Sequence, residues 1–208
     1  MLNRFLRVCW TKLMTPIAKA FLALGISPDV VTVVGTLGVA FGALAFYPRG
    51  EFLTGTLVIT AFVFADNVDG VMARLSDRQG PWGAFLDSTF DRVGDAAIFG
   101  GLVLYYAGPG AHLGMAGLAL ACLILGMVVS YAKARAEGLG MTCNVGIAER
   151  ADRLLAVLLA TGLVGLGVTP WLLGVVLALL ALASAVTVVQ RMATVHRQAL
   201  AIDPAATP

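Results

Sequence analysis

Long apolar runs alternate with short polar segments along most of the chain. The segments between the runs, such as YPRGE and AGPGAH, are rich in Gly and Pro, so we expect neighbouring helices to run antiparallel. Six runs approach the roughly twenty helical residues that cross a bilayer, and they cover residues 28–47, 52–75, 82–107, 112–134, 149–167 and 170–192. The pattern predicts an all-α integral membrane protein with six transmembrane helices in one bundle, formed by residues 25–198.

The two ends of the chain have a different pattern. In residues 1–24, apolar positions such as Leu2, Leu6 and Leu13 recur at helical spacing while cations fall on the opposite side. This predicts an amphipathic helix that lies along the membrane surface. It has no compact apolar core followed by a cleavage site, so we expect it to be retained. Residues 199–208, which end in AIDPAATP, are expected to form a disordered tail.

The composition excludes a soluble domain. Hydrophobic residues make up 59% and charged residues 12% of the 208 positions, and the mean hydropathy is +0.90, as in polytopic membrane proteins. A net charge of +2 gives no sign of a nucleic-acid partner. Cys9, Cys122 and Cys143 are widely separated, which favours apolar filling over a metal or redox site.

Positive charges are distributed unequally between the two ends of the predicted helices. Arg49 falls on one side and Arg92 within a run, whereas all the other Lys and Arg fall on the second side. By the positive-inside rule, both termini and the 74–81 turn are predicted to be cytoplasmic, in a multi-pass protein of the cell membrane.

Four carboxylates interrupt the second and third apolar runs. Asp66 and Asp69 are three residues apart, and Asp87 and Asp91 are four apart, so each pair lies on one helix face. Each acid costs about 2.5–3.5 kcal/mol inside a membrane, and bound cations would offset this cost. Oxygen-only ligands suit Mg²⁺ or Mn²⁺, and two such ions would form a phosphoryl-transfer site. Nearby Arg92 and Asp95 are expected to support the site by an ion pair or hydrogen bonds.

Two other protein classes also place acids in membrane helices. An ion transporter is expected to show broken helices or related halves near the midplane, whereas these acids lie off-centre beside one turn, in a single copy. An intramembrane prenyltransferase is expected to carry its two aspartate-rich motifs on separated helices. Here both pairs fall within one helical hairpin.

The spacing of these residues resembles a known signature. The run D66-x2-D69-G70-x2-A73-R74-x8-G83-x3-D87-x3-D91 is similar to that of the CDP-alcohol phosphotransferase family, membrane enzymes that make phospholipids from CDP-linked donors. The resemblance implies that Asp66, Asp69, Asp87 and Asp91 bind two metal ions and that Asp91 is also the general base. It further implies a homodimer.

The resemblance also implies where the CDP moiety binds. It assigns Gly70 and Arg74 to the nucleotide, with Gly80 and the helix start Asp29, Val30, Val31 and Thr32 as further candidates. In the stretch ISPDVVT, Ser27 and Pro28 are also what ordinary helix initiation requires. Both interpretations of that stretch stay open.

Lys133, Arg135, Arg153 and Arg191 fall at the cytoplasmic ends of later helices. Membrane anchoring alone would explain them, but convergence in one bundle would make a site for a phosphorylated acceptor. The stretches SYAKARAEGLG and ERADR resemble the actinobacterial phosphatidylinositol phosphate synthase branch of the family. That branch transfers the phosphatidyl group of CDP-diacylglycerol to 1D-myo-inositol 3-phosphate. The alternative is the phosphatidylglycerophosphate synthase branch, with glycerol 3-phosphate as acceptor.

Overall fold

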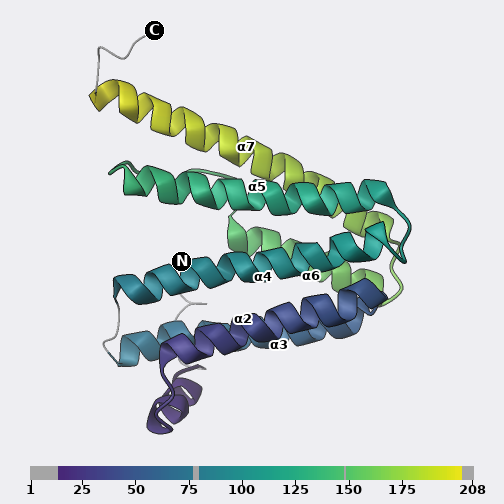
Figure 1. Ribbon diagram of the computed structural model, residues 1–208, viewed down its shortest axis with the longest axis horizontal. Coiled ribbons are helices and arrows are strands. Elements are labelled where there is room, and N and C mark those ends of the chain that lie inside the picture. The colour runs from purple at the N-terminus through teal and green to yellow at the C-terminus, as the bar shows by residue number, and fades with distance from the viewer. Residues whose placement is uncertain (1–13, 77–79, 148, 203–208) are drawn as a thin grey trace, which may run out of the picture.

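Helices make up most of the part of the chain that the structure describes, which is residues 14–76, 80–147 and 149–202 of a computed structural model. A first helical segment, Met14–Ala23, precedes six longer helices that lie side by side and roughly aligned (Figure 1). With one short 3₁₀ helix, η1, the order is α2 (Pro28–Phe46), η1 (Tyr47–Arg49), α3 (Phe52–Leu75), α4 (Pro81–Ala107), α5 (Leu113–Gly138), α6 (Arg150–Gly165) and α7 (Trp171–Ile202).

Each of the six predicted runs forms one helix. Two of them, α5 and α7, continue past the predicted ends at residues 134 and 192. By length and composition, four helices of the described chain can cross a membrane, namely α2 with η1, α3, α5 and α7. The other two are α4, which carries charged residues in its first half, and α6, whose 16 residues rise only about 24 Å.

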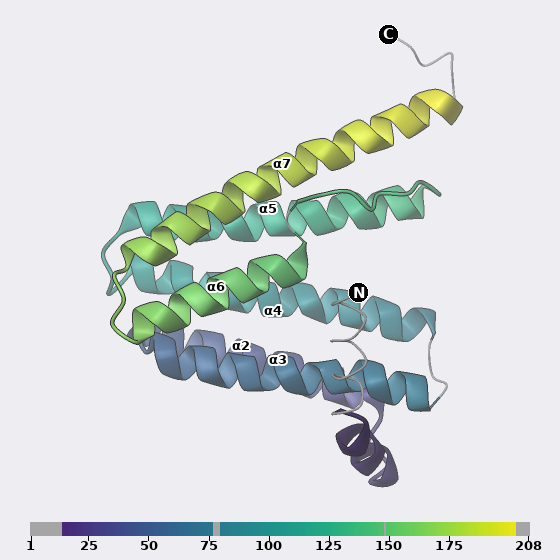
Figure 2. The same ribbon diagram turned by 180° about the vertical axis from the view of Figure 1, so that it is seen from behind.

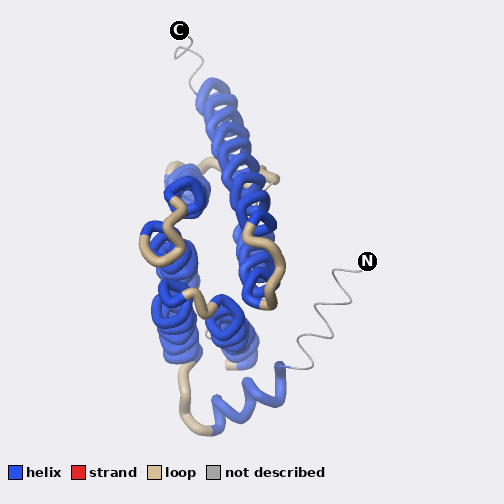
Figure 3. The backbone as a smooth tube through the Cα atoms, turned by 90° about the vertical axis from the view of Figure 1, so that its right-hand side faces the viewer, coloured by secondary structure: helices blue, strands red, loops and turns tan. Residues whose placement is uncertain are grey.

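The two chain ends are described in part. Met14 and Ala18 pack against α2 and α3, whereas Ile17 is exposed, and this segment lies across the bundle rather than along it (Figure 3). Residues 1–13 of the predicted amphipathic helix lie outside the described residues. The prediction of a disordered tail from residue 199 is wrong for residues 199–202, which continue α7 as part of one apolar helix, and residues 203–208 lie outside the description.

Helix ends follow local sequence signals. The Ser27 hydroxyl accepts a hydrogen bond from the Val30 amide at 3.4 Å, and Pro28 occupies the first position of α2, as expected at a helix N-terminus. Gly50 closes the turn between α2 and α3 with φ of 79°, a conformation that suits glycine. The start of α2, the end of α3 and the start of α4 therefore lie at one end of the bundle (Figure 1).

Close packing between α2 and α4 depends on a glycine. A Cβ on Gly101 would lie 2.7 Å from the Ala43 carbonyl oxygen, whereas a Cβ on the adjacent Gly100 would have no neighbour within 4 Å. Around this contact α2 packs on α3 and α4, α5 packs on α4 and α7, and α6 packs on α3 and α7.

The segment between α5 and α6 determines where α6 starts. It leaves the end of α5 and runs back beside that helix before α6 begins (Figure 2). Three side chains of α7 hold it: Thr187 accepts from the Ile147 amide at 3.1 Å, Arg191 Nε donates to the Val145 carbonyl at 3.0 Å, and Gln198 accepts from the Thr142 amide at 3.0 Å. Helix α6 therefore begins within the bundle, beside α5, and not at the end of the bundle where α5 stops.

The two adjacent glycines of α4 provide a matched test of this packing. We expect Gly101→Val to lower the free energy of unfolding by about 1–3 kcal/mol, because α4 must move away from the Ala43 carbonyl. Gly100→Val should change it by no more than about 0.5 kcal/mol. Thermal unfolding of both variants in the same detergent measures the difference, and equal midpoints would contradict the packing argument.

Candidate active site

Three adjoining cavities lie in the part of the bundle that carries the acidic residues. The acidic cavity, about 200 Å³, is lined by Asp69, Asp87, Asp91 and Arg150 among others. The glycine cavity, about 340 Å³, is named for Gly70, Gly80 and Gly83. The arginine cavity, about 760 Å³, is named for Arg92, Arg150, Arg153 and Arg191. Asp69 and Asp87 line both the acidic and the glycine cavity, whereas Asp91 and Arg150 line both the acidic and the arginine cavity.

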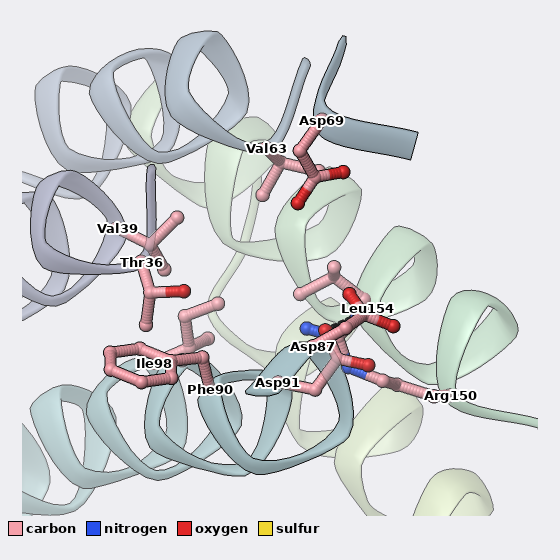
Figure 4. A pocket seen from close by; sticks show the side chains of 11 residues that line it. Thr36, Val39, Val63, Asp69, Asp87, Phe90, Asp91, Ile98, Arg150 and Leu154 are labelled. Atoms are coloured by element: carbon pink, nitrogen blue, oxygen red, sulfur yellow. Dashed lines mark ion pairs between the residues drawn. The ribbon is translucent and has the colours of Figure 1, made fainter. Parts of the chain in front are cut away.

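The acidic cavity brings carboxylates of two helices together. Asp69 comes from α3, and Asp87 and Asp91 come from successive turns of α4 (Figure 4). The Thr32 hydroxyl of α2 donates to Asp69. Among the described residues, no cation forms an ion pair with Asp69 or Asp87. Asp66 lies in α3 one turn earlier, and its side chain is not among those described.

Asp91 has a different environment, because arginines approach both of its oxygens. Arg150 Nη1 lies 2.7 Å from Oδ1, and Arg92 Nη2 lies 3.7 Å from Oδ2. One turn further along α4, buried Asp95 faces three guanidinium groups, at 3.1 Å from Arg150 Nε and 3.8 Å from both Arg92 and Arg153 Nη2. The predicted supporting ion pair of Arg92 and Asp95 is confirmed.

The chemistry of the acidic cavity fits hard divalent cations. Its polar lining is carboxylate and hydroxyl oxygen apart from Arg150, with no Cys or His, as Mg²⁺ and Mn²⁺ prefer. Two of the three carboxylates form no ion pair with a described cation, and only the more distant Arg74 acts on Asp69, so the cavity carries negative charge that its own ion pairs do not compensate. Among the described side chains, however, no three potential ligands converge closely enough to hold an ion.

The glycine cavity contains five of the seven residues predicted for the nucleotide. They are Asp29, Thr32, Gly70, Arg74 and Gly80. Cβ atoms added to Gly80 or Gly83 would meet nothing within 4 Å, so both glycines leave open space. The Trp82 indole donates to Asp29 at 3.0 Å and thereby links the starts of α4 and α2.

Val30 and Val31 do not line this cavity. They are rotated by about 100° and 200° from Asp29 on the helix, and Val31 is buried in the cluster that includes Val68 of α3. Their amides also have partners, since both donate to Ser27, one to the hydroxyl and one to the carbonyl. The structure therefore favours ordinary helix initiation at these two positions.

The arginine cavity contains three of the four predicted acceptor residues. Lys133, Arg153 and Arg191 line it, and Arg153 is only 2% exposed. Gly126 of α5 lies beside Arg153, and an added Cβ would be in ordinary contact with its guanidinium at 3.5 Å. Arg135 is exposed and does not line the cavity. It is two positions from Lys133, and side chains two positions apart on a helix point in directions that differ by about 200°.

Arg150 is the site residue that the sequence did not single out. Its position at a helix start made it resemble an ordinary cytoplasmic anchor. The available signal is its spacing of three residues from Arg153 in RADR, which places both on one face of α6.

Comparison with known proteins agrees with this geometry. The CDP-alcohol phosphatidyltransferase profile matches residues 25–179, a range that contains the whole acidic signature. The chain belongs to the CDP-alcohol phosphatidyltransferase family. The predicted resemblance is therefore confirmed, and the protein is a multi-pass membrane transferase of a family whose site uses divalent metal.

Similar members of the family share most of their length with this chain. It is 50% identical to a phosphatidylinositol phosphate synthase of Streptomyces avermitilis, over 99% of this chain and 86% of the relative. In two crystal structures of the Mycobacterium tuberculosis phosphatidylinositol phosphate synthase, the protein is 41% identical in sequence to this chain. The one with CDP-DAG bound has a TM-score of 0.84 and covers 88% of this chain and 94% of that one. The complex with manganese and citrate has a TM-score of 0.81 and covers 88% of both chains.

The contrast between Asp87 and Asp95 leads to a stability prediction. Asp95→Asn should lower the free energy of unfolding by about 3 kcal/mol, because the buried Arg153 and the partly buried Arg92 and Arg150 lose a counter-charge. Asp87→Asn should leave it unchanged or raise it, because no described cation pairs with Asp87. Both are compared with the wild type by thermal unfolding in detergent with a metal chelator present. A larger loss for Asp87→Asn would contradict the assignment of partners.

Proposed function

We propose that this transferase moves the phosphatidyl group of CDP-diacylglycerol to 1D-myo-inositol 3-phosphate, giving phosphatidylinositol phosphate and CMP. The observation that carries the proposal is the set of three adjoining cavities, in which the acidic cavity shares carboxylates with each of the other two. Such a set suits a nucleotide in the glycine cavity, a diphosphate over the carboxylates and an anionic acceptor in the arginine cavity. The names of the similar synthases and the CDP-DAG in the mycobacterial structure support the same donor and acceptor.

The four signature carboxylates, Asp66, Asp69, Asp87 and Asp91, are proposed as ligands of two Mg²⁺ or Mn²⁺ ions. Bound there, the ions would neutralise the diphosphate and stabilise the attacking and leaving oxygens. The hydrogen bond from Thr32 orients Asp69, as partners of metal ligands commonly do. Manganese in the related mycobacterial structure supports this assignment.

Asp91 is proposed as the general base, because it lies at the boundary between the acidic and arginine cavities. Its carboxylate takes the proton of the acceptor hydroxyl. The resulting oxygen forms a bond to the lipid-proximal phosphorus, the phosphoanhydride bond breaks in line, and CMP leaves with the bond's electron pair. Arg74, in the glycine cavity, is placed to pair with a phosphate of the donor.

Lys133, Arg153 and Arg191 are proposed to bind the acceptor's phosphate. Arg191 already donates to the carbonyls of Val129 and Val145, so its guanidinium is held in a fixed position beside the cavity. An acceptor without a phosphate would need fewer cations than this cavity provides.

The membrane arrangement completes the proposal. We infer that all six helices α2 to α7 cross the membrane, with both termini and the three cavities on the cytoplasmic side. The charged half of α4 and the start of α6 are paired with each other, which lowers the cost of placing them in a bundle. The homodimer stays a prediction from the family resemblance.

A transfer assay tests the function. Purified protein in detergent with CDP-diacylglycerol and Mg²⁺ or Mn²⁺ should incorporate label into lipid, with equal release of CMP, when labelled 1D-myo-inositol 3-phosphate is the acceptor. Labelled glycerol 3-phosphate, free inositol and serine serve as comparisons. Preferential transfer to glycerol 3-phosphate would support the phosphatidylglycerophosphate synthase branch instead, and transfer to none would overturn the proposal.

Two cations of α5 provide a matched test of the acceptor site. Lys133→Gln removes a charge from the arginine cavity and should raise the KM for the acceptor about tenfold, since charged hydrogen bonds contribute about 1.5 kcal/mol or more. The KM for CDP-diacylglycerol should stay the same. Arg135→Gln removes an exposed charge two residues away and should change neither constant. Equal effects of the two substitutions would indicate general anchoring.

A further inference from the structure

Arg150 and Asp91 together separate the acidic cavity from the arginine cavity. Both residues line both cavities, and their side chains meet in the close-up of the site (Figure 4). Arg150 Nη1 lies 2.7 Å from Asp91 Oδ1. The ion pair therefore lies where an acceptor hydroxyl from the arginine cavity would meet the acidic cavity.

The ion pair occupies the carboxylate that the proposed reaction needs. Arg150 faces one oxygen of Asp91, and Arg92 faces the other at 3.7 Å. A divalent cation on Asp91 would be brought close to the Arg150 guanidinium, and two positive groups at such a distance repel each other. Arg150 and a metal ion therefore compete for Asp91.

Arg150 has a second anchor and room to move. Its Nε lies 3.1 Å from Asp95 Oδ1, a contact that does not involve Asp91. Its side chain is 31% exposed, and the adjoining arginine cavity has about 760 Å³. Guanidinium groups bind phosphate in a two-pronged manner, so Arg150 can turn from Asp91 to an anion in that cavity while it stays bound to Asp95.

We propose that Arg150 is a positioning residue with two alternative partners. It pairs with Asp91 while the acidic cavity holds no divalent cation, and with the acceptor's phosphate once Asp91 ligates a cation. The inference rests on the proposed roles of Asp91 and of the arginine cavity. Metal and acceptor then strengthen each other's binding, and the coupling is reciprocal because it is thermodynamic.

The first experiment measures Mn²⁺ binding in the absence of both substrates, from the electron paramagnetic resonance signal of free Mn²⁺. Arg150→Gln should bind Mn²⁺ about five- to tenfold more tightly than the wild type, because the competing cation is gone. Arg150→Lys keeps the charge with only one point of contact and should show a smaller increase. Arg135→Gln, outside the cavities, should match the wild type.

The second experiment measures binding of 1D-myo-inositol 3-phosphate by calorimetry, with and without Mn²⁺ and without the lipid donor, so that no turnover occurs. In the wild type, Mn²⁺ should strengthen this binding about five- to tenfold. In Arg150→Gln the two conditions should give the same affinity. Arg135→Gln should retain the wild-type coupling.

A purely structural role of Arg150 predicts the opposite results. Arg150→Gln would then bind Mn²⁺ no more tightly than the wild type, or would keep the coupling, and either result overturns the proposal. If Arg150→Gln does not yield folded protein, the same comparisons are made with Arg150→Lys, and unchanged Mn²⁺ affinity there also overturns it. If the wild type binds no inositol phosphate under either condition, the proposed acceptor is wrong, and the Mn²⁺ experiment alone decides whether Arg150 competes for Asp91.

Discussion

Ionised groups within a bundle of membrane helices need counter-charges, and the site is arranged around this requirement. Asp91 and Asp95 obtain theirs from Arg92, Arg150 and Arg153. Asp69 and Asp87 form no ion pair with the described cations and face a shared cavity. The protein thus neutralises Asp95 with its own side chains, leaves Asp69 and Asp87 available to bound cations, and pairs Asp91 with arginines that a cation would have to replace.

The short α6 is a consequence of the same requirement. A helix that crossed the whole bundle would carry its first arginines to the end, away from Asp91 and Asp95. The segment before it instead runs back beside α5 (Figure 2), held by Thr187 and Arg191 of α7.

Much of this arrangement could be predicted from the sequence, because it depends on local periodicity. The apolar runs locate the six helices, and the spacing of Asp69, Asp87 and Asp91 places them on faces that meet. The path of the chain from α5 to α6 has no such periodicity, since tertiary hydrogen bonds to α7 determine it. For that reason Arg150 looked like an anchor at a helix end, and its contact with Asp91 was not predicted.

The direction in which each side chain points from its helix explains why some predicted site residues do not line a cavity. The stretch Asp29 to Thr32 is continuous in sequence, but only its first and last residues share the face toward the glycine cavity. Lys133 and Arg135 differ for the same reason. Proximity in sequence was enough to suggest these candidates, and the 3.6-residue period separates them.

The distribution of cations between the cavities has a consequence for the chemistry. Donor and acceptor of the proposed reaction are both anions, and they repel each other unless each is held by separate positive groups. Arg74 lies in the glycine cavity, whereas Lys133, Arg153 and Arg191 lie in the arginine cavity. The carboxylates Asp69 and Asp87 adjoin the first group, and Asp91 adjoins the second. Separate cations for the two anions lower the repulsion between them, so that the acceptor hydroxyl can approach the donor at Asp91.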